Sequence, residues 1–170
     1  MLNTLLKIKS NLVSTMENIV GKDNVLSSYE ERFIYSTDST NITNPKEIAD
    51  VIVFPENVQQ VSKIMKYANS KNIAVVARSA GTNLCGACLP KRKGIILNFS
   101  RMDKILEINK DNLICRVQPG VVVEDLQKAV QEFDLFYPPD PSNLKVSMIG
   151  GSIGLSSGGP HTFKFDGSGG

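Results

Sequence analysis

The sequence contains few of the residues that build metal sites, disulfide frameworks or membrane spans. Its 170 residues include one histidine, three cysteines and no tryptophan. Three thiols are an odd number and too few for a secreted disulfide framework. No apolar run approaches the ~20 residues that a transmembrane helix needs, and the N-terminus lacks the unbroken apolar core and the cleavage site of a secretory signal. We therefore expect a cytoplasmic protein with no transmembrane segment.

The charge pattern points to no special partner. The net charge is +2, and the extra positive charges are scattered, with one short run at Lys91, Arg92 and Lys93. No basic residues interleave with aromatic ones, so a solvated surface is favoured over a nucleic-acid site. Apolar residues make up 41% of the chain, which is enough for one domain with a core.

The first candidate site is a loop of small residues that follows an apolar strand. Residues 73–77 form a short β-branched run, which is typical of a strand covered on both faces. Most of residues 79–86 are small, so backbone N–H groups are left open to a ligand. Such a turn can form a concave nest for a phosphate, and Arg78 would add a positive charge. An ordinary strand-to-loop turn with small packing residues is the alternative.

Residues 137–160 repeat this chemistry at greater length. Pro138, Pro139 and Pro141 predict an extended entry, because proline locks φ and keeps the preceding residue out of the helical region. Residues 150–159 are mostly glycine and serine, but four apolar residues anchor the segment, unlike a flexible linker. These anchors are Met148, Ile149, Ile153 and Leu155. No G-x-G-x-x-G fingerprint lies between a strand and a helix, so the common dinucleotide fold is unsupported.

Five motifs in order carry a family resemblance. They are residues 78–84 (RSAGTNL), 94–101 (GIILNFSR), 117–120 (VQPG), 137–142 (YPPDPS) and 149–159 (IGGSIGLSSGG). The pattern resembles the flavin domain of FAD-linked oxidases of the p-cresol methylhydroxylase and vanillyl-alcohol oxidase type. Within that superfamily it is most similar to the flavin subunits of D-lactate dehydrogenase and glycolate oxidase. The resemblance covers residues 29–164.

The resemblance implies a bound FAD, whose pyrophosphate lies between the two small-residue loops. It also implies oxidation of a 2-hydroxy acid, D-lactate or glycolate, by hydride transfer to the flavin. The residues that match the motifs and are expected to contact FAD are Arg78, Ser79, Ala80, Gly81, Thr82, Asn83, Leu84, Pro139, Asp140, Pro141, Ser142, Ile149, Gly150, Gly151, Ser152, Gly158 and Gly159.

The chain divides into three predicted parts. Residues 1–44 comprise an amphipathic helix over residues 1–20 and a connecting segment, in which residues 29–43 are expected to be irregular. Residues 45–165 form the partial FAD-binding domain, and residues 166–170 a flexible tail. Asp38 in the connection could touch the flavin or a substrate, but capping of its own backbone is favoured.

The apolar patterns predict an α+β fold with a mixed sheet. Residues 48–54 and 73–77 read as strands joined by a helix that opens at residues 56–57, which is a β-α-β unit with a right-handed crossover. Residues 94–99 predict another strand, and residues 105–108 and 113–118 an antiparallel hairpin. A helix over residues 123–133 follows, with Leu126, Ala129, Val130 and Phe133 on its inner side. Two helices would then cover one sheet.

Cys85 and Cys88 have C-x-x-C spacing, but a metal site is not predicted. Zinc would need two further ligands, and only Cys115 and His161 remain, both far away in sequence. A thioredoxin-like motif would open a helix, whereas this pair lies in the small-residue loop. We expect both thiols to act as small packing groups under a ligand.

No catalytic residue can be assigned from the sequence. Oxidation of a hydroxy acid needs a base for the hydroxyl proton and a cation for the carboxylate, and His161 is the only histidine. In the resembling family a separate substrate domain follows the flavin domain, so this chain alone is expected to be inactive. A missing C-terminal half, a companion subunit or an electron-transfer protein would be its partner. The alternative is a non-catalytic truncated or split-gene fragment that binds flavin weakly or acts as an interaction subunit.

Overall fold

The computed structural model describes residues 2–40 and 47–161, with side chains from residue 11 onward. It contains two compact units, residues Met1–Asn98 and Phe99–Gly170. Each unit has its own cluster of buried apolar residues. The predicted tail, residues 166–170, lies outside the described residues.

The first unit is built on a four-stranded mixed sheet in the order β1-β2-β4-β3. The strands are β1 (Val25–Leu26), β2 (Val51–Val53), β3 (Val75–Arg78) and β4 (Ile95–Asn98). Strand β4 pairs in parallel with both β2 and β3, whereas β1 pairs antiparallel with β2. Helix α3 (Val58–Ser70) joins β2 to β3, as the predicted β-α-β unit requires, and β4 inserts between the two strands. The mixed sheet is therefore confirmed.

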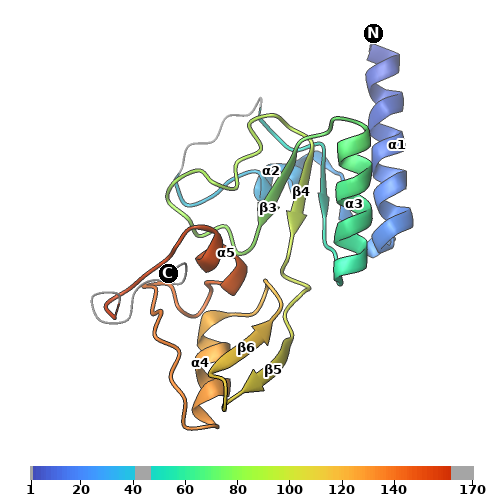
Figure 1. Cartoon of the computed structure of the whole chain (residues 1–170). Coiled ribbons are helices and arrows are strands. Elements are labelled where there is room, and N and C mark those ends of the chain that lie inside the picture. The colour runs from blue at the N-terminus through green and yellow to red at the C-terminus, as the bar shows by residue number, and fades with distance from the viewer. Residues whose placement is uncertain (1, 41–46, 162–170) are drawn as a thin grey trace. The chain divides into compact units, whose positions relative to one another are not determined.

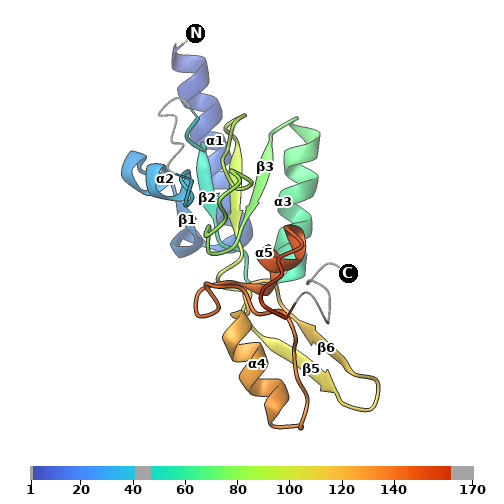
Figure 2. The same cartoon turned by 90° about the vertical axis from the view of Figure 1, so that its left-hand side faces the viewer.

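Both faces of the two central strands are covered. Figures 1 and 2 show α1 (Leu2–Val20) and α3 on one face of the sheet and α2 (Tyr29–Tyr35) on the other. On the α2 face, Ile52 and Ile96 pack with Phe54 and Tyr35, whose rings meet edge to face at 5.5 Å. Successive side chains of a strand point to opposite faces. Because both faces are covered here, all residues of β2 and residues 95–97 of β4 are buried.

The first two long helices follow their apolar spacing. In α1, the buried residues Leu12, Met16 and Val20 recur every fourth position, which confirms the amphipathic helix. Helix α3 begins where the Oδ1 atom of Asn57 accepts a hydrogen bond from the Gln60 N–H group at 2.9 Å. This side-chain cap satisfies one of the free N–H groups at the start of the helix.

The expectation of an irregular connection over residues 29–43 was wrong at its start, where α2 forms. The Ser28 hydroxyl accepts from the Glu31 N–H group at 3.3 Å, and the Ser28 N–H group donates to Glu31 Oε2 at 3.1 Å. This reciprocal pair is a capping box. The Ser28 hydroxyl also donates to Glu31 Oε2 at 2.7 Å, and this hydrogen bond, followed by that of the Ser28 N–H group, lowers the pKa of Glu31. The S-x-x-E spacing of Ser28 and Glu31 is the sequence signal for this box. Residues 41–43 lie outside the described part.

Strand β3 is also less covered than its β-branched run suggested. Within the described residues it pairs only with β4, so it lies at the edge of the sheet. Val75, Val76 and Arg78 are half-buried, and Ala77 is exposed. A short apolar run does not distinguish an edge strand from a central one, because both bury at least one face.

The second unit consists of a hairpin, two helices and long connecting loops. Strands β5 (Ile105–Asn109) and β6 (Ile114–Val117) form the predicted antiparallel hairpin. Helices α4 (Val123–Gln131) and α5 (Ile149–Gly154) complete the unit. Leu126 and Val130 of α4 are buried against residues of the hairpin. Phe133 was placed wrongly on the inner side: it follows the end of α4 and is 43% exposed.

The prediction that the two helices cover one sheet was wrong. Helix α3 belongs to the unit of the four-stranded sheet, and α4 belongs to the unit of the hairpin. Periodicity shows which side of a helix is apolar, but it does not show which strands that side meets.

We predict that Ile52→Ala destabilises the first unit by about 2–5 kcal/mol, because it empties a fully buried site between β4 and α2. Urea unfolding followed by circular dichroism measures the loss. Ile34→Ala is the matched control, since Ile34 is 63% exposed and its truncation leaves no cavity. Equal losses in the two variants would contradict the packing described for β2.

Candidate functional site

The first loop is held by the side chain of the residue that ends β3. The Arg78 guanidinium donates from Nη1 to the carbonyl oxygen of Thr37 and to Cys88 Sγ, the latter at 3.2 Å. It also lies 5.8 Å from the centroid of the Tyr35 ring, a cation–π distance. Arg78 therefore ties the start of the loop to residues 35–37 and to the buried thiol of Cys88.

Gly81 lies against this guanidinium in a left-handed conformation. Its φ of 75° is in the left-handed region, and a Cβ atom there would collide with the Arg78 guanidinium. Glycine is the residue that adopts this conformation without strain. The loop therefore depends on glycine at this position chiefly for its conformation, because the guanidinium is the end of a flexible side chain and can move.

Asn83 shapes the second half of the loop. Its Oδ1 atom accepts from the N–H groups of Cys85 and Ala87, at 3.2 and 3.1 Å, and its Nδ2 atom donates to Cys88 Sγ at 3.1 Å. In contrast, the N–H groups of residues 80–84 donate to no backbone carbonyl within the described part of the chain. This row of available donors fits an anionic group such as a pyrophosphate.

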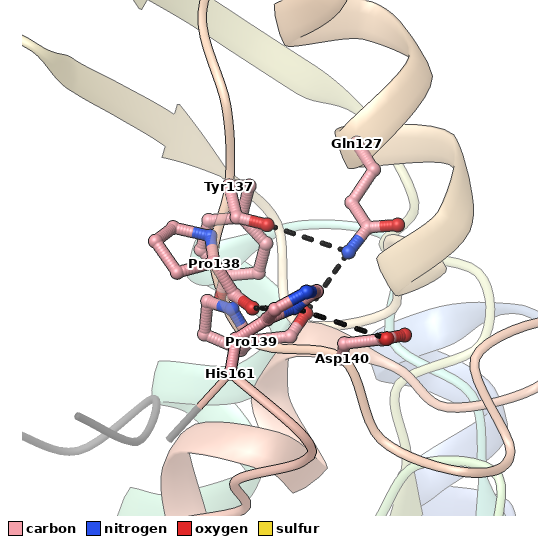
Figure 3. Close-up of polar contacts among 6 residues, drawn as sticks. All are labelled: Gln127, Tyr137, Pro138, Pro139, Asp140 and His161. Atoms are coloured by element: carbon pink, nitrogen blue, oxygen red, sulfur yellow. Dashed lines mark hydrogen bonds and ion pairs between the residues drawn. The ribbon is translucent and has the colours of Figure 1, made fainter. Parts of the chain in front are cut away.

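The second loop begins with the proline-rich segment, residues 137–141. Figure 3 shows the side chains of Gln127 and His161 directed at its carbonyl groups. Gln127 Nε2 donates to the carbonyl oxygens of Tyr137 and Pro139, at 3.3 and 3.0 Å. His161 Nδ1 lies 3.2 Å from the carbonyl oxygen of Pro138. Burial raises the pKa of the half-buried Tyr137.

Three of the sequence motifs meet within the second unit. The Gly150 N–H group donates to the Pro119 carbonyl at 2.8 Å, and a Cβ atom at Gly150 would lie 2.6 Å from the Pro119 Cβ. A Cβ atom at Gly159 would collide with the carbonyl oxygen of Asp140. The glycines of residues 149–159 thus allow the backbone to approach both the VQPG and the YPPDPS motifs.

Part of the second loop is helical, which the sequence analysis did not expect. Residues Ile149–Gly154 form α5, in which Ile149 and Ser152 are buried. Ile149 is therefore an apolar anchor, as predicted. Ile153 and Leu155 were assigned that role wrongly, because they are 54% and 43% exposed.

The predicted flavin-contacting residues differ in how accessible they are. Those of the first motif belong to the first unit and the remainder to the second. Ile149 and Ser152 are buried, and Leu84, Ser142 and Gly159 are exposed. The half-buried ones are Arg78, Ser79, Ala80, Gly81, Thr82, Asn83, Pro139, Asp140, Pro141, Gly150, Gly151 and Gly158.

Asp38 caps its own backbone, as favoured from the sequence. Its Oδ1 atom accepts from the N–H group of Thr40 at 2.9 Å and from the Thr40 hydroxyl. Its Oδ2 atom is buried and has no hydrogen-bond partner in the described part of the structure. The sequence does not indicate the burial of this second oxygen, because a capping carboxylate uses only one of its oxygens.

The described residues include no cluster of three or more histidine, cysteine, aspartate or glutamate side chains that could hold a metal ion. The three cysteines are free thiols: Cys88 is buried, Cys85 is exposed and Cys115 is half-buried. No described helix is long and apolar enough to cross a membrane.

Comparison with known proteins places these motifs in a family. A family model described as an FAD binding domain matches residues 49–168. Glycolate oxidase subunit GlcD of Bacillus subtilis is 37% identical over 158 residues, which make up 93% of this chain and 33% of that protein. D-lactate dehydrogenase of Archaeoglobus fulgidus is 36% identical over 115 residues, 68% of this chain and 26% of that protein. The chain thus spans about a third or less of these relatives.

The fold has a counterpart among solved structures. The crystal structure of p-cresol methylhydroxylase with substrate bound matches with a TM-score of 0.74 and 23% identity, over 88% of this chain and 29% of that one. This likeness confirms the predicted α+β fold of the p-cresol methylhydroxylase type. Because the family model covers residues 49–168, the chain belongs to the FAD binding domain family, and FAD is its cofactor.

Proposed function

We propose that this chain is the FAD-binding portion of an oxidoreductase that oxidises a 2-hydroxy acid, glycolate or D-lactate. The observation that carries the proposal is the pair of relatives named glycolate oxidase subunit and D-lactate dehydrogenase, at 37% and 36% identity. Bound FAD supplies the acceptor for the hydride that leaves the α-carbon of the substrate. The hydroxyl group loses its proton in the same reaction, so the product is a 2-oxo acid.

We assign the binding of the FAD pyrophosphate to the two small-residue loops, residues 78–84 and the predicted contacts within 139–159. The N–H groups of residues 80–84 support the assignment, because they have no backbone acceptor in the described part of the chain. Backbone donors on a turn with a left-handed glycine suit an anion. In this proposal Arg78 and Asn83 shape the first loop with their side chains, and the backbone makes the contacts.

The groups that bind and deprotonate the hydroxy acid are assigned to a part of the enzyme outside this chain. His161 is the only histidine, and its Nδ1 atom is directed at the Pro138 carbonyl. A C-terminal half, a companion subunit or an electron-transfer protein would supply the missing groups and accept the electrons. The Bacillus relative is itself named a subunit. The cytoplasm remains the predicted location on the basis of composition.

We predict that Gly81→Val abolishes FAD binding and leaves the secondary structure intact. A β-branched side chain would force the loop away from the Arg78 guanidinium and is strained at a φ of 75°. The measurement is flavin absorbance after desalting of the FAD-loaded protein. Gly21→Val is the matched control, because Gly21 also has a positive φ, 90°, but a Cβ atom there would meet only Asn24 Nδ2, at an ordinary contact distance of 3.9 Å. Stoichiometric flavin in the Gly81→Val variant would contradict the assignment of this loop to pyrophosphate binding.

We predict that the double variant Cys85→Ser, Cys88→Ser keeps both its FAD content and its metal content. A serine hydroxyl at position 88 can still accept the hydrogen bonds that Arg78 and Asn83 donate to the thiol. Flavin absorbance and elemental analysis for zinc check this. Zinc that copurifies with the parent chain and is lost in the variant would show that the thiols bind metal.

The FAD-loaded chain, mixed anaerobically with glycolate or D-lactate, should keep the absorbance of oxidised flavin. Turnover needs the substrate held near the flavin, and a misplacement of about 1 Å costs ~100-fold in rate. Rapid bleaching by this chain alone would place the catalytic groups within it and make His161 the leading base.

A chimera tests the substrate class directly. This chain replaces the corresponding third of the Bacillus glycolate oxidase subunit, and the chimera should bleach with a hydroxy acid. The Gly81→Val chimera, which lacks flavin, is the control. A chimera that holds FAD but is bleached by neither acid would contradict the proposed function.

A further inference from the structure

The proline-rich segment has unusually few ways to be held in place. Pro138, Pro139 and Pro141 have no N–H group, so over residues 138–141 only Asp140 has a backbone donor. The segment must therefore be fixed largely through its carbonyl oxygens. Its conformation matters because Pro139, Asp140, Pro141 and Ser142 are among the predicted flavin contacts.

Three successive carbonyl oxygens of this segment each contact a side-chain nitrogen. Gln127 can donate to the carbonyl oxygens of both Tyr137 and Pro139, because its amide group carries two hydrogens. The Nδ1 atom of His161 contacts the carbonyl oxygen of Pro138, which lies between those two residues in the chain (Figure 3). A carbonyl oxygen only accepts hydrogen bonds, so the proton of this contact is on Nδ1 of His161. Together the two side chains fix the direction of three consecutive peptide groups.

Both side chains are themselves well supported. Gln127 lies on α4 between residues that are anchored in the core of the unit, Leu126 and Val130. The His161 ring meets the Phe136 ring edge to face at 5.5 Å, and its Nδ1 atom is 3.9 Å from Asp140 Oδ2. His161 therefore contacts Asp140 within the segment and Phe136 just before it.

We propose that Gln127 and His161 are positioning residues for the flavin-binding segment, residues 139–142. The inference rests on the proposed function, and it assigns a role to two residues outside the predicted set of flavin contacts. They act through the backbone carbonyls, not by contact with FAD. The segment, once fixed, presents the Asp140 and Ser142 groups in one orientation before the cofactor arrives, which lowers the ordering cost of binding.

The experiment compares four single variants of the full chain. Gln127→Met keeps the length of the side chain and removes both donors. Gln131→Met is its matched control, because Gln131 is exposed one turn further along α4. His161→Phe keeps an aromatic ring beside Phe136 but has no donor. His161→Asn restores one, because its amide nitrogen is as many bonds from Cα as Nδ1 of histidine.

Two readouts separate positioning from the proposed function. The first is hydrogen exchange, by NMR and without FAD, of the Val146 and Ser147 N–H groups, which donate to the Asn143 carbonyl oxygen next to the segment, both at 2.9 Å. The second is the dissociation constant for FAD by fluorescence titration. Gln127→Met and His161→Phe should speed the exchange and weaken FAD binding by roughly three- to thirtyfold, as expected for one or two lost hydrogen bonds. Gln131→Met should change neither readout, and His161→Asn should lie near the parent chain in both.

Unchanged exchange in Gln127→Met and His161→Phe would overturn the proposal, because the carbonyls would then not depend on these donors. Faster exchange with unchanged FAD affinity would also overturn it, since the segment would be held but would not contribute to the flavin site. A parent chain that binds no FAD would instead overturn the proposed function, and the exchange readout would still show whether the two residues hold the segment.

Discussion

Close approach of the backbone at glycines is the constraint on which both candidate loops depend. At Gly81 the main chain lies against the Arg78 guanidinium, and at Gly159 it lies against the Asp140 carbonyl oxygen. At Gly150 it donates to the carbonyl of Pro119. A methyl group at any of these positions would overlap atoms already present. The small residues therefore do two things: they leave backbone donors accessible, and they let distant motifs of the same unit meet.

The same geometry separates the residues of the loops into two roles. Arg78 and Asn83 looked like ligand-binding side chains in the sequence, yet both make hydrogen bonds within the protein that define the loop. The guanidinium keeps its charge near the loop while its Nη1 atom is occupied by Thr37 and Cys88. An anion at this loop would thus meet backbone N–H dipoles, with the arginine charge close to the same backbone at Gly81.

The elements that sequence reasoning placed correctly are those with strong local patterns. The apolar runs at β2 and β4, the hairpin and the helices α1 and α3 were all expected close to their observed bounds. Helix α5 was missed because glycine is a poor helix former, and Gly150 and Gly151 lie in its first turns. The contact of Gly150 with Pro119 favours the helix at this point, and such a contact cannot be read from a local window.

In the candidate site, too, contacts between residues far apart in the sequence could not be predicted from local patterns. The motifs identified the two loops because runs of small residues and prolines are easily recognised in a sequence. A residue that shapes a loop through its carbonyl oxygens leaves none, since any amide or imidazole donor at the right place in the fold would serve. Gln127 lies ten and twelve residues from the two carbonyls it contacts, and His161 lies 23 from its own. Only the folding of α4 beside the proline-rich segment makes the glutamine one of its neighbours. Sequence motifs therefore identify the backbone that faces a cofactor more readily than the side chains that hold that backbone in place.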